Sequence, residues 1–327
     1  MVLAKVGARD HGGRVRPVDP GRDMGAIADL IEVAFGEELQ RAEGNRLVAD
    51  LRYMAVLGPL LTVVDRVTPL AAGYVWEQDG RLVGNVSIAP EDRARRRWFI
   101  SNVAVHPEYQ GRGIGRQLME AALAGIRHQG GRQAVLQVRA DNEHAQRLYR
   151  RLGFVRFDTL VELLRPGLYP TAARPALAVR RLRNSDWPAL LNLAQATVPI
   201  EAQRVRKIQP QAFRPTLGRR LQDWFDNLVN GRSFLRWGLE EGGLLVAVVS
   251  VLVPGDGTPV RLDLSVRPGF RGPLEGPLAD LGLVALRGYV PRPVAANISV
   301  SHPEALAALQ ERHFAAIRTL DQLVLEW

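Results

Sequence analysis

The sequence predicts two tandem α/β (α+β) domains, and three observations carry this prediction. The chain has 327 residues, enough for two compact units of about 150 residues each. The same order of strands and helices can be traced twice along it, once in each half of the chain. Between the copies, a segment with three prolines and one glycine has neither strand nor helix periodicity. We therefore expect a first domain at 1–165, a linker at 166–176 and a second domain at 177–327.

The composition is that of an ordinary globular protein. Hydrophobic residues make up 46% of the chain and charged residues 24%. The lack of cysteine excludes disulfides, thiolate metal ligands and a cysteine nucleophile. The longest apolar stretch, Leu244–Val253, is shorter than the roughly 20 residues that span a bilayer, and the first residues lack a signal-peptide pattern. These features predict a cytoplasmic protein with no membrane partner.

The formal net charge of +9 raises the question of a nucleic-acid partner. Only Lys5 and Lys207 among the 43 basic residues are lysine, a ratio more typical of codon bias than of a selected surface. The basic residues are scattered and form no stripe along a helix. We therefore do not expect nucleic-acid binding, although the positive charge would attract a polyanionic cofactor.

Each copy begins with a strand, an amphipathic helix and a hairpin. Glycine stands in both hairpin turns, where positive φ is expected. The first copy has Val15, Arg16 and Val18 in the strand, a helix from Asp23 with Ile27, Leu30, Ile31 and Ala34 on one face, and a hairpin turn at Gln78-Asp79-Gly80. The second has Val179, Arg180 and Leu182, a helix capped by Asp186 with Leu190, Leu191 and Ala194, and a turn at Glu241-Gly242-Gly243.

Two longer segments align without a gap and give the strongest sign of duplication. VAVHPEYQGRG at Val103–Gly113 lies over LSVRPGFRGPL at Leu264–Leu274 with a constant offset of 161 residues, so that Val105, Pro107 and Gly111 recur as Val266, Pro268 and Gly272. Any two α/β domains could share an order of elements, but a shared segment of this kind predicts a tandem duplication.

A glycine-rich loop follows the predicted strand Trp98–Val105 and precedes a helix. It reads Gln-Gly-Arg-Gly-Ile-Gly from Gln110 to Gly115. Glycine lets several backbone N–H groups face one point, and the start of the helix adds about half a positive charge, so the loop predicts a phosphate-binding nest. A dinucleotide fingerprint is excluded because Arg116 stands where it needs glycine, and the chain has no P-loop motif. A turn that merely links strand and helix is the alternative.

A second motif follows one predicted strand later, at Ala140–Phe157. It consists of Asn142, Ala145, Leu148, Tyr149, Leu152, Gly153 and Phe154. Together with the loop pattern of Gln110, Gly113 and Gly115, this motif resembles the GNAT superfamily of N-acetyltransferases in a tandem arrangement. The resemblance implies that each domain is a mixed, mostly antiparallel twisted sheet flanked by helices.

The resemblance also implies that the first domain binds acetyl-coenzyme A, and no metal is expected because the histidines near the motifs lack metal-ligand spacing. In the family, strands four and five splay apart after a bulge, and the pantetheine arm lies between them. By resemblance, the backbone of Val103 and Val105 binds that arm, and an N–H group of the strand polarises the thioester carbonyl. The residues expected around the pyrophosphate are Gln110, Gly111, Arg112, Gly113, Ile114, Gly115 and Arg116. Asn142 is also expected at the cofactor, with helix capping as its alternative role.

Tyr149 stands where the family keeps the phenol that protonates the leaving thiolate, and core packing is its alternative role. Many relatives have a carboxylate on strand four as the base, but Ser101 and Asn102 stand there in this chain. No base is therefore assigned. The remaining candidates, Glu37, Glu38, Glu91 and Asp92, are expected to be solvated, and His106 and His144 lack metal-ligand spacing.

The second copy is expected to have lost the cofactor site. When the gapless alignment is carried through the loop, Pro273, Leu274, Glu275 and Pro277 replace Arg112, Gly113, Ile114 and Arg116. Proline removes N–H donors, leucine resists positive φ, and glutamate puts a negative charge where the pyrophosphate would lie. In the second motif, Leu309 replaces Tyr149.

The resemblance implies transfer of an acetyl group to a primary amine. A small molecule is the first expectation for the acceptor, a peptide or protein amino group is the alternative, and a non-catalytic acetyl-coenzyme A sensor stays open. A homodimer also stays open. Mycothiol synthase is a tandem member of similar length, but its second copy holds the intact site, which argues against that identity because the first copy is intact here.

Overall fold

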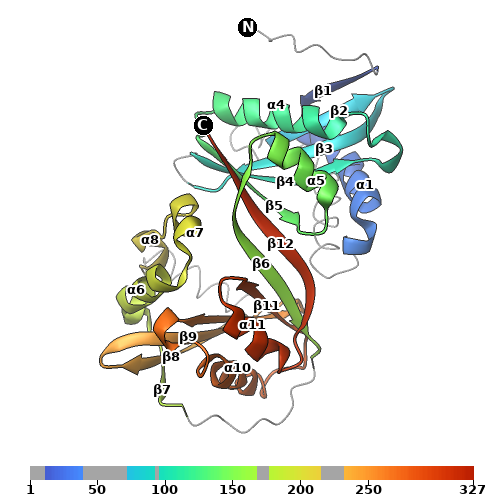
Figure 1. Ribbon diagram of the computed structural model, residues 1–327. Coiled ribbons are helices and arrows are strands. Elements are labelled where there is room, and N and C mark those ends of the chain that lie inside the picture. The colour runs from blue at the N-terminus through green and yellow to red at the C-terminus, as the bar shows by residue number, and fades with distance from the viewer. Residues whose placement is uncertain (1–11, 40–71, 93–95, 168–176, 215–231) are drawn as a thin grey trace. The chain divides into compact units, whose positions relative to one another are not determined.

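The computed structural model describes residues 12–39, 72–92, 96–167, 177–214 and 232–327 (Figure 1). The chain divides into two compact units that are interleaved along the sequence. Unit 1 comprises Met1–Gln137, Leu148–Phe154 and Val324–Trp327, and unit 2 comprises Val138–Arg147 and Val155–Leu323. The units thus differ from the expected division at residue 165, because residues 155–165 group with unit 2 and the last four residues group with unit 1.

Unit 1 is a mixed sheet with the strand order β1-β2-β3-β4-β5. Neighbouring strands are antiparallel except for the parallel pair β4 and β5. Its elements are β1 (Gly13–Pro17), α1 (Pro20–Leu39), β2 (Ala72–Gln78), β3 (Arg81–Pro90), β4 (Arg97–Val105), α4 (Ile114–His128), most of β5 (Gln133–Arg139) and the end of α5 (Glu143–Arg151).

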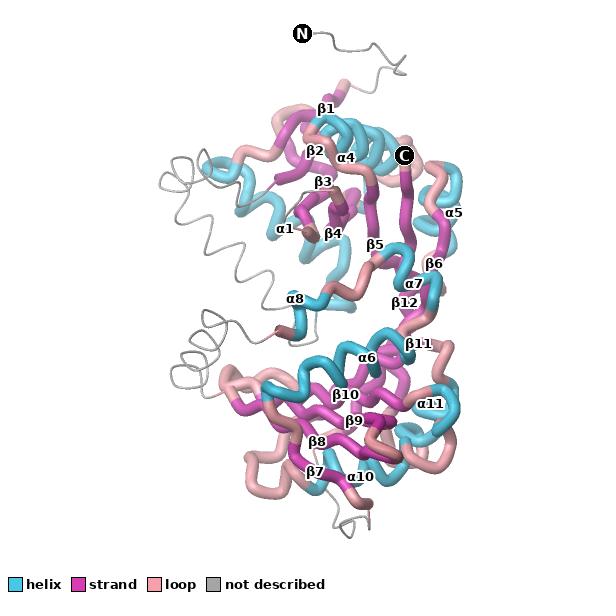
Figure 2. Tube along the Cα trace, turned by 90° about the vertical axis from the view of Figure 1, so that its left-hand side faces the viewer, coloured by secondary structure: helices cyan, strands magenta, loops and turns pink. Residues whose placement is uncertain are grey.

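Unit 2 repeats this arrangement in the order β12-β6-β11-β10-β9-β8-β7, with β10 and β11 parallel. Its strands are drawn in magenta in Figure 2. Its strands are β6 (Val155–Arg165), β7 (Val179–Arg181), β8 (Ser233–Glu241), β9 (Leu244–Val253), β10 (Val260–Val266), β11 (Val294–Ser299) and most of β12 (Ala315–Glu326). Its helices are α6 (Trp187–Thr197), α7 (Ile200–Val205), α8 (Pro210–Phe213), α10 (Glu275–Val284) and α11 (Pro303–Gln310). The predicted fold class, a mixed and mostly antiparallel arrangement of strands flanked by helices in each unit, is confirmed.

Helices α1 and α4 cover opposite faces of the unit 1 sheet. Val75 of β2 packs in one cluster with Ile27 and Ile31 of α1, whereas the neighbouring Tyr74 lies against Gly125 of α4. Adjacent side chains of a strand point to opposite faces, so each face is buried under its own helix. The apolar face predicted for α1 is confirmed.

In unit 2, strand β9 is buried on both faces. Val249 and Val251 lie against Gly282 of α10, and Val248 packs with Leu193 of α6. This explains why the sequence of β9 is almost continuously apolar instead of alternating. Burial on both faces of a sheet thus accounts for the longest apolar run of the chain. No helix in the described ranges is long and apolar enough to cross a membrane.

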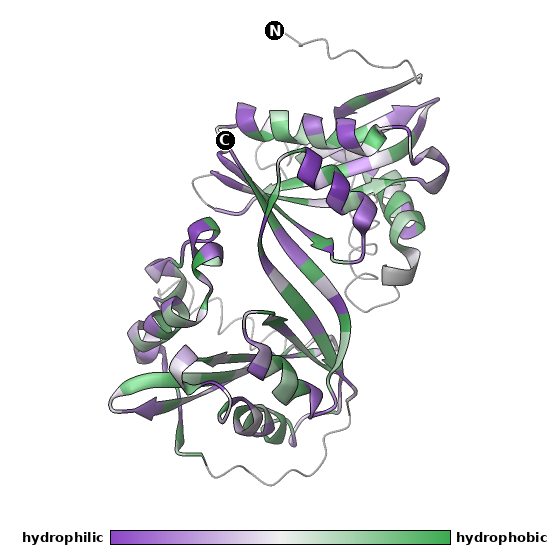
Figure 3. Ribbon diagram, in the orientation of Figure 1, coloured by the Kyte–Doolittle hydropathy of each residue, from purple (hydrophilic) through white to green (hydrophobic). Residues whose placement is uncertain are grey.

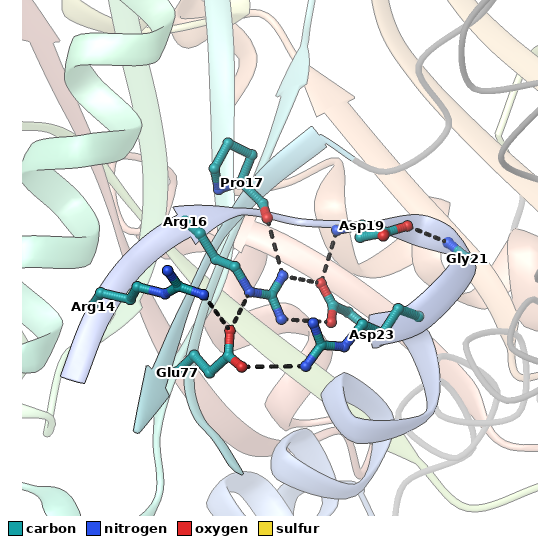
Figure 4. A network of polar contacts seen from close by, with 8 residues as sticks. Arg14, Arg16, Pro17, Asp19, Gly21, Asp23 and Glu77 are labelled. Atoms are coloured by element: carbon teal, nitrogen blue, oxygen red, sulfur yellow. Dashed lines mark hydrogen bonds and ion pairs between the residues drawn. The ribbon is translucent and has the colours of Figure 1, made fainter. Parts of the chain in front are cut away.

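A network of charged side chains ties the first strand, the first helix and the second strand of unit 1 together (Figure 4). Arg16 donates from Nε to Glu77 at 2.6 Å and from both terminal nitrogens to Asp23 at 2.6 and 2.8 Å. Asp23 also accepts the backbone N–H of Asp19 at 2.8 Å, which caps the start of α1. Burial raises the pKa of Asp23, but these donors outweigh it and hold the pKa below its ordinary value.

Unit 2 contains the same network. Arg180 pairs with Asp186 at 2.9 Å and with Glu240 at 2.5 Å, and Asp186 accepts the backbone N–H of Arg183. Arg180 stands 164 residues after Arg16, and Asp186 and Glu240 each stand 163 residues after Asp23 and Glu77 of unit 1. The duplication is therefore visible in side-chain contacts as well as in strand order.

Replacing Arg16 by methionine should destabilise unit 1 by about 3–5 kcal/mol, because it leaves the carboxylate of Asp23 buried without a cation. Asp23 is 2% exposed. The matched change Arg180→Met in unit 2 should cost about 0–1 kcal/mol, because the Arg180 side chain is 44% exposed. Urea denaturation at pH 7 measures both.

The stability that the pair of Asp23 and Arg16 contributes should decrease as the pH falls. The pKa of Asp23 is lowered in the folded protein, so the stability that its pair with Arg16 contributes is present above the unfolded value of about 3.9 and is lost as the pH falls through the folded pKa. The deficit of Arg16→Met relative to the wild type should therefore shrink toward pH 3. A deficit that is constant with pH, or equal losses for both variants, would contradict the assignment.

Candidate active site

The glycine loop of unit 1 leaves an open space at the start of α4. Gly111 has φ of 77° and Gly113 has φ of 80°, both in the left-handed region that favours glycine. A Cβ atom added at either position would meet no protein atom within 4 Å. The conformation therefore requires glycine, and the space above the loop is not filled by the described residues.

Gly115 differs from the other two glycines. Its φ is not positive, and an added Cβ would lie at ordinary contact distances of 3.7 Å from Leu148 and 3.8 Å from Val105. The expectation that three glycines turn the loop therefore holds for Gly111 and Gly113, whereas Gly115 belongs to the first turn of α4. The contact with Leu148 places α5 beside the start of α4.

The start of α4 has amide groups available for an anion. Gly113 is the N-cap and has no side chain to accept from the helix, and Gln117 donates the N–H that bonds to the Gly113 carbonyl. The N–H groups before Gln117 have no carbonyl within the helix to bond. Together with the partial positive charge of the helix start, they are suited to bind an anion, and the phosphate-binding role of this loop stays a prediction.

Three polar side chains of the loop make local contacts. Gln110 donates from Nε2 to the carbonyl of Val105 at 3.1 Å, which ties the loop to the end of β4. Arg112 lies over the ring of Tyr109 at 5.0 Å, and Arg116 pairs with Glu120 at 2.8 Å. Both arginines are exposed, so each guanidinium can turn toward a bound phosphate.

Replacing Gly113 by alanine should weaken binding of acetyl-coenzyme A about tenfold. A side chain in the left-handed region costs about 1–2 kcal/mol, so the loop relaxes away from the nest and the ligand must restore it. Gly115→Ala is the matched control and should change the Kd less than twofold, because its Cβ meets only ordinary contacts. Isothermal calorimetry on the full chain measures both, and equal effects would remove the special role of Gly113.

Strands β4 and β5 part near the loop, as the resemblance implied. Their parallel pairing runs from Arg97 and Gln133 to Ile100 and Leu136, although β4 continues to Val105. On its other edge, β4 has a bulge, because its register with β3 shifts between Asn85 and Ser87. Val103 and Val105, which we predict to bind the pantetheine arm, lie on β4 beyond the end of the pairing.

Tyr149 is the buried residue of α5, a helix that is otherwise hydrophilic over most of its length (Figure 3). Its side chain is 6% exposed and its ring meets Phe154 edge to face at 5.9 Å. Burial raises the pKa of Tyr149 to about 12, so the phenol is neutral at physiological pH. Within the described ranges its hydroxyl makes no hydrogen bond, which leaves its proton free for a ligand.

Other candidates from the sequence have structural contacts. The Oδ1 atom of Asn142 accepts the N–H of Ala145 at 3.0 Å, which is a helix cap, and a cofactor contact of Asn142 stays a prediction. Glu91 pairs with Arg97 at 2.5 Å, and Asp92 accepts the N–H of Arg96 at 2.8 Å. The side chains of Glu37 and Glu38 lie outside the described residues.

None of these contacts identifies a general base for the amine. The described residues also contain no cluster that could hold a metal ion. His106 accepts the N–H of Glu108, and His144 is exposed. No group of three or more His, Asp or Glu side chains in the described ranges is arranged to hold a metal ion.

Unit 2 lacks the phenol at the equivalent position. In unit 1 the N–H of Phe154 bonds to the carbonyl of Tyr149 at 3.0 Å, and in unit 2 the N–H of Phe314 bonds to that of Leu309 at 3.1 Å. His313 takes positive φ as Gly153 does. These equal contacts support the sequence pairing of Leu309 with Tyr149.

In unit 2, the loop before α10 contacts a carboxylate of the chain itself. Glu275, the first residue of α10, is fully buried; it accepts the N–H of Gly272 at 2.8 Å and pairs with Nε2 of His302 at 2.8 Å. Leu274 has φ of −96°, whereas Gly113 in unit 1 has positive φ. A carboxylate of the chain thus occupies amide donors of this loop, where a ligand phosphate would need them.

Comparisons with known proteins place this geometry in context. A model of the acetyltransferase (GNAT) family matches residues 46–154. The chain is 39% identical over 90 residues to N-alpha-acetyltransferase 30 of Schizosaccharomyces pombe, covering 27% of this chain and 59% of that protein. It is 36% identical over 187 residues to a mycothiol acetyltransferase of Cellulomonas flavigena, covering 54% of this chain and 49% of that protein. The chain thus spans about half the length of the curated relatives it matches.

One solved structure matches nearly the whole chain. It is a tandem GNAT protein from the clavulanic acid biosynthesis pathway, with a TM-score of 0.58 and 18% sequence identity over 96% of this chain and 98% of that chain. At this identity the likeness concerns the fold alone, and it agrees with the duplicated sheet described above.

Proposed function

We propose that unit 1 transfers the acetyl group of acetyl-coenzyme A to a primary amine of a small molecule, because a model of the acetyltransferase (GNAT) family matches residues 46–154 of this chain. The observation that carries the proposal is the joint presence, in one compact unit, of the open glycine nest at α4 and the buried, neutral phenol of Tyr149. Leu148, the residue next to Tyr149, lies against Gly115 in the first turn of α4.

The residues present fit the cofactor. A pyrophosphate suits the uncapped amides of α4, and the exposed Arg112 and Arg116 add charge-assisted hydrogen bonds. The parted strands β4 and β5 offer backbone groups of Val103 and Val105 to the pantetheine arm. When bound, acetyl-coenzyme A supplies the acetyl thioester.

Tyr149 and the backbone of β4 would each assist one part of the acetyl transfer. The nitrogen of the amine forms a bond to the acetyl carbon, the carbon–sulfur bond breaks, and Tyr149 holds the proton that the departing sulfur takes. A backbone N–H of β4 stabilises the developing oxyanion, a contribution of about 3 kcal/mol. The amine also loses a proton, for which β4 offers no carboxylate, and water can accept it.

The relatives support two acceptor classes. Similarity to a mycothiol acetyltransferase of Cellulomonas flavigena favours a small-molecule amine. Similarity to N-alpha-acetyltransferase 30 favours the alternative, an amino group of a peptide or protein. Unit 2, with Glu275 in its loop and Leu309 in place of the phenol, is proposed to be structural.

The test is incubation of the full chain with acetyl-coenzyme A and a panel of small amines and peptide N-termini, following release of free thiol. Thiol release that depends on an amine, with an acetylated product identified by mass spectrometry, supports the proposal and identifies the acceptor class. Binding of acetyl-coenzyme A in calorimetry without turnover on any amine indicates a sensor. Failure of the folded full chain to bind acetyl-coenzyme A rejects both.

A further inference from the structure

The bulge in β4 interrupts its regular pairing with β3 at one place. Asn85 pairs with Ala104 and Ser87 pairs with Ser101, so two residues of β4, Asn102 and Val103, oppose one residue of β3. Asn102 adopts φ of 51°, in the left-handed region that is rare for residues other than glycine. A bulge of this kind interrupts the ladder, and its unpaired groups need another partner when buried.

Asn85 supplies that partner. Its side-chain amide donates from Nδ2 to the carbonyl of Asn102 at 2.9 Å. Asn85 is fully buried, and its Oδ1 atom has no hydrogen-bond partner in the described ranges. An asparagine in this position costs free energy of desolvation, so its presence points to a task that an apolar residue cannot perform.

Unit 2 provides an internal comparison. There Val248 pairs with Ser265 at the equivalent place, and β9 and β10 continue in register without a shift. By contrast, the bulge between β2 and β3 at Trp76 and Glu77 recurs between β8 and β9 at Leu239 and Glu240. The bulge of β4, however, is found only in unit 1, which has the open glycine loop.

The parting of the strands does not explain this difference. The parallel pairing of β10 and β11 also ends early, at Arg261 and Ala295. What a bulge adds is one residue, and because backbone N–H and C=O groups alternate between the two edges of a strand, one extra residue changes which groups face the open edge.

We propose that Asn85 is a positioning residue, which holds the bulge at Asn102 and thereby sets which backbone groups of β4 face the pantetheine arm and the thioester. The proposal rests on the proposed function of unit 1. It adds a residue that acts on the cofactor through the backbone of β4, without touching the glycine loop.

The decisive variant is Asn85→Val, which copies the residue of unit 2. Acetyl-coenzyme A should bind about tenfold more weakly, as expected for the loss of one or two hydrogen bonds to the arm. Adenosine 3′,5′-diphosphate, which has the phosphates but no pantetheine, should bind with unchanged Kd, because the loop at α4 is intact. Calorimetry on the full chain measures both ligands.

Two variants of Asn102 serve as a matched pair and as an independent test if Asn85→Val does not fold. Asn102→Gly keeps positive φ accessible and should bind acetyl-coenzyme A as the wild type does, whereas Asn102→Val should resemble Asn85→Val. Ser87→Ala, which keeps the bond from Asn85 to Asn102, should be neutral. Unchanged affinity in folded Asn85→Val, or in Asn102→Val, would overturn the proposal.

The outcomes separate this proposal from the proposed function. If the wild type fails to bind acetyl-coenzyme A, the function itself is rejected and the Asn85 proposal falls with it. The wild type can instead bind acetyl-coenzyme A and turn it over while Asn85→Val loses the same affinity for acetyl-coenzyme A and for adenosine 3′,5′-diphosphate. In that case Asn85 supports only the general stability of unit 1, and the positioning role is rejected.

Discussion

Replacing Tyr149 by phenylalanine should lower kcat by about a hundredfold to ten-thousandfold and leave the Kd for acetyl-coenzyme A nearly unchanged. The change removes one hydroxyl from a side chain that is 6% exposed, and it keeps the ring that packs on Phe154. Because the hydroxyl makes no hydrogen bond in the described ranges, its loss should not disturb the fold. The effect should therefore fall on proton transfer to the leaving sulfur.

Tyr74→Phe is the matched control for this prediction. Tyr74 is a second tyrosine of unit 1 whose pKa is raised by burial, and it packs between β2 and α4. Replacing Tyr74 should leave kcat within about twofold, because this partly buried side chain lies against Gly125 of α4 and not beside the glycine loop. Steady-state kinetics with the acceptor identified from the amine panel gives both values. Equal kcat for Tyr149→Phe and the wild type would return Tyr149 to a packing role.

The raised pKa of Tyr149 also defines the pH range of its action. A phenol donates its proton only while neutral, and burial raises the pKa of Tyr149 to about 12. The contribution of Tyr149 should therefore persist at alkaline pH, beyond the ordinary value of about 10. The kcat ratio of wild type to Tyr149→Phe should be the same at pH 7 and pH 10.

Deleting the last four residues, Val324–Trp327, should unfold or strongly loosen unit 1 and abolish acetyl-coenzyme A binding. These residues belong to unit 1 although they end the chain. The indole N–H of Trp327 donates to the carbonyl of Gly131 at 2.7 Å, and its ring lies under the guanidinium of Arg127 at 4.7 Å. Glu326 accepts from Gln133 of β5 at 2.5 Å. Without them, the edge of β5 in unit 1 loses its partner.

Hydrogen exchange resolved by segment is the measurement for this deletion. Amides of β5 and α4 should exchange faster in the shortened chain, while those of β9 and β10 in unit 2 should keep their protection. Trp327→Ala is the milder variant and should lower the stability of unit 1 by about 2 kcal/mol. Wild-type protection of β5 after the deletion would show that the chain end contributes nothing. For the same reason, functional tests should use the full chain, since a fragment 1–165 lacks these residues.

Features that depend on neighbouring residues could be predicted from the sequence. The hairpin turns at Asp79-Gly80 and Gly242-Gly243 adopt the positive φ that their residues predict. The glycine loop and the helix after it were found because glycine restricts where a chain can turn and apolar spacing marks a buried helix face. The open space above Gly111 and Gly113 agrees with the nest that the motif implied.

Features that depend on residues far apart could not be predicted. Gln133 and Glu326 are 193 positions apart, and no pattern in either segment indicates that they meet. Asn85 was missed because it stands in a strand of mostly apolar residues, where only its polar side chain was a signal. The roles assigned to Val103, Val105 and Asn142 in cofactor binding stay predictions.

The carboxylate that fills the loop of unit 2 has a consequence for how the two halves of the molecule respond to their surroundings. The start of a helix keeps its partial positive charge whether or not a ligand is bound, and a nearby negative charge stabilises it. Glu275 supplies it from within the chain, so α10 has its counter-charge at every concentration of acetyl-coenzyme A. The start of α4 has no acidic residue in its first turn, so the proposed ligand would supply its counter-charge. If unit 1 binds acetyl-coenzyme A as proposed, that ligand should stabilise α4 and leave α10 unaffected.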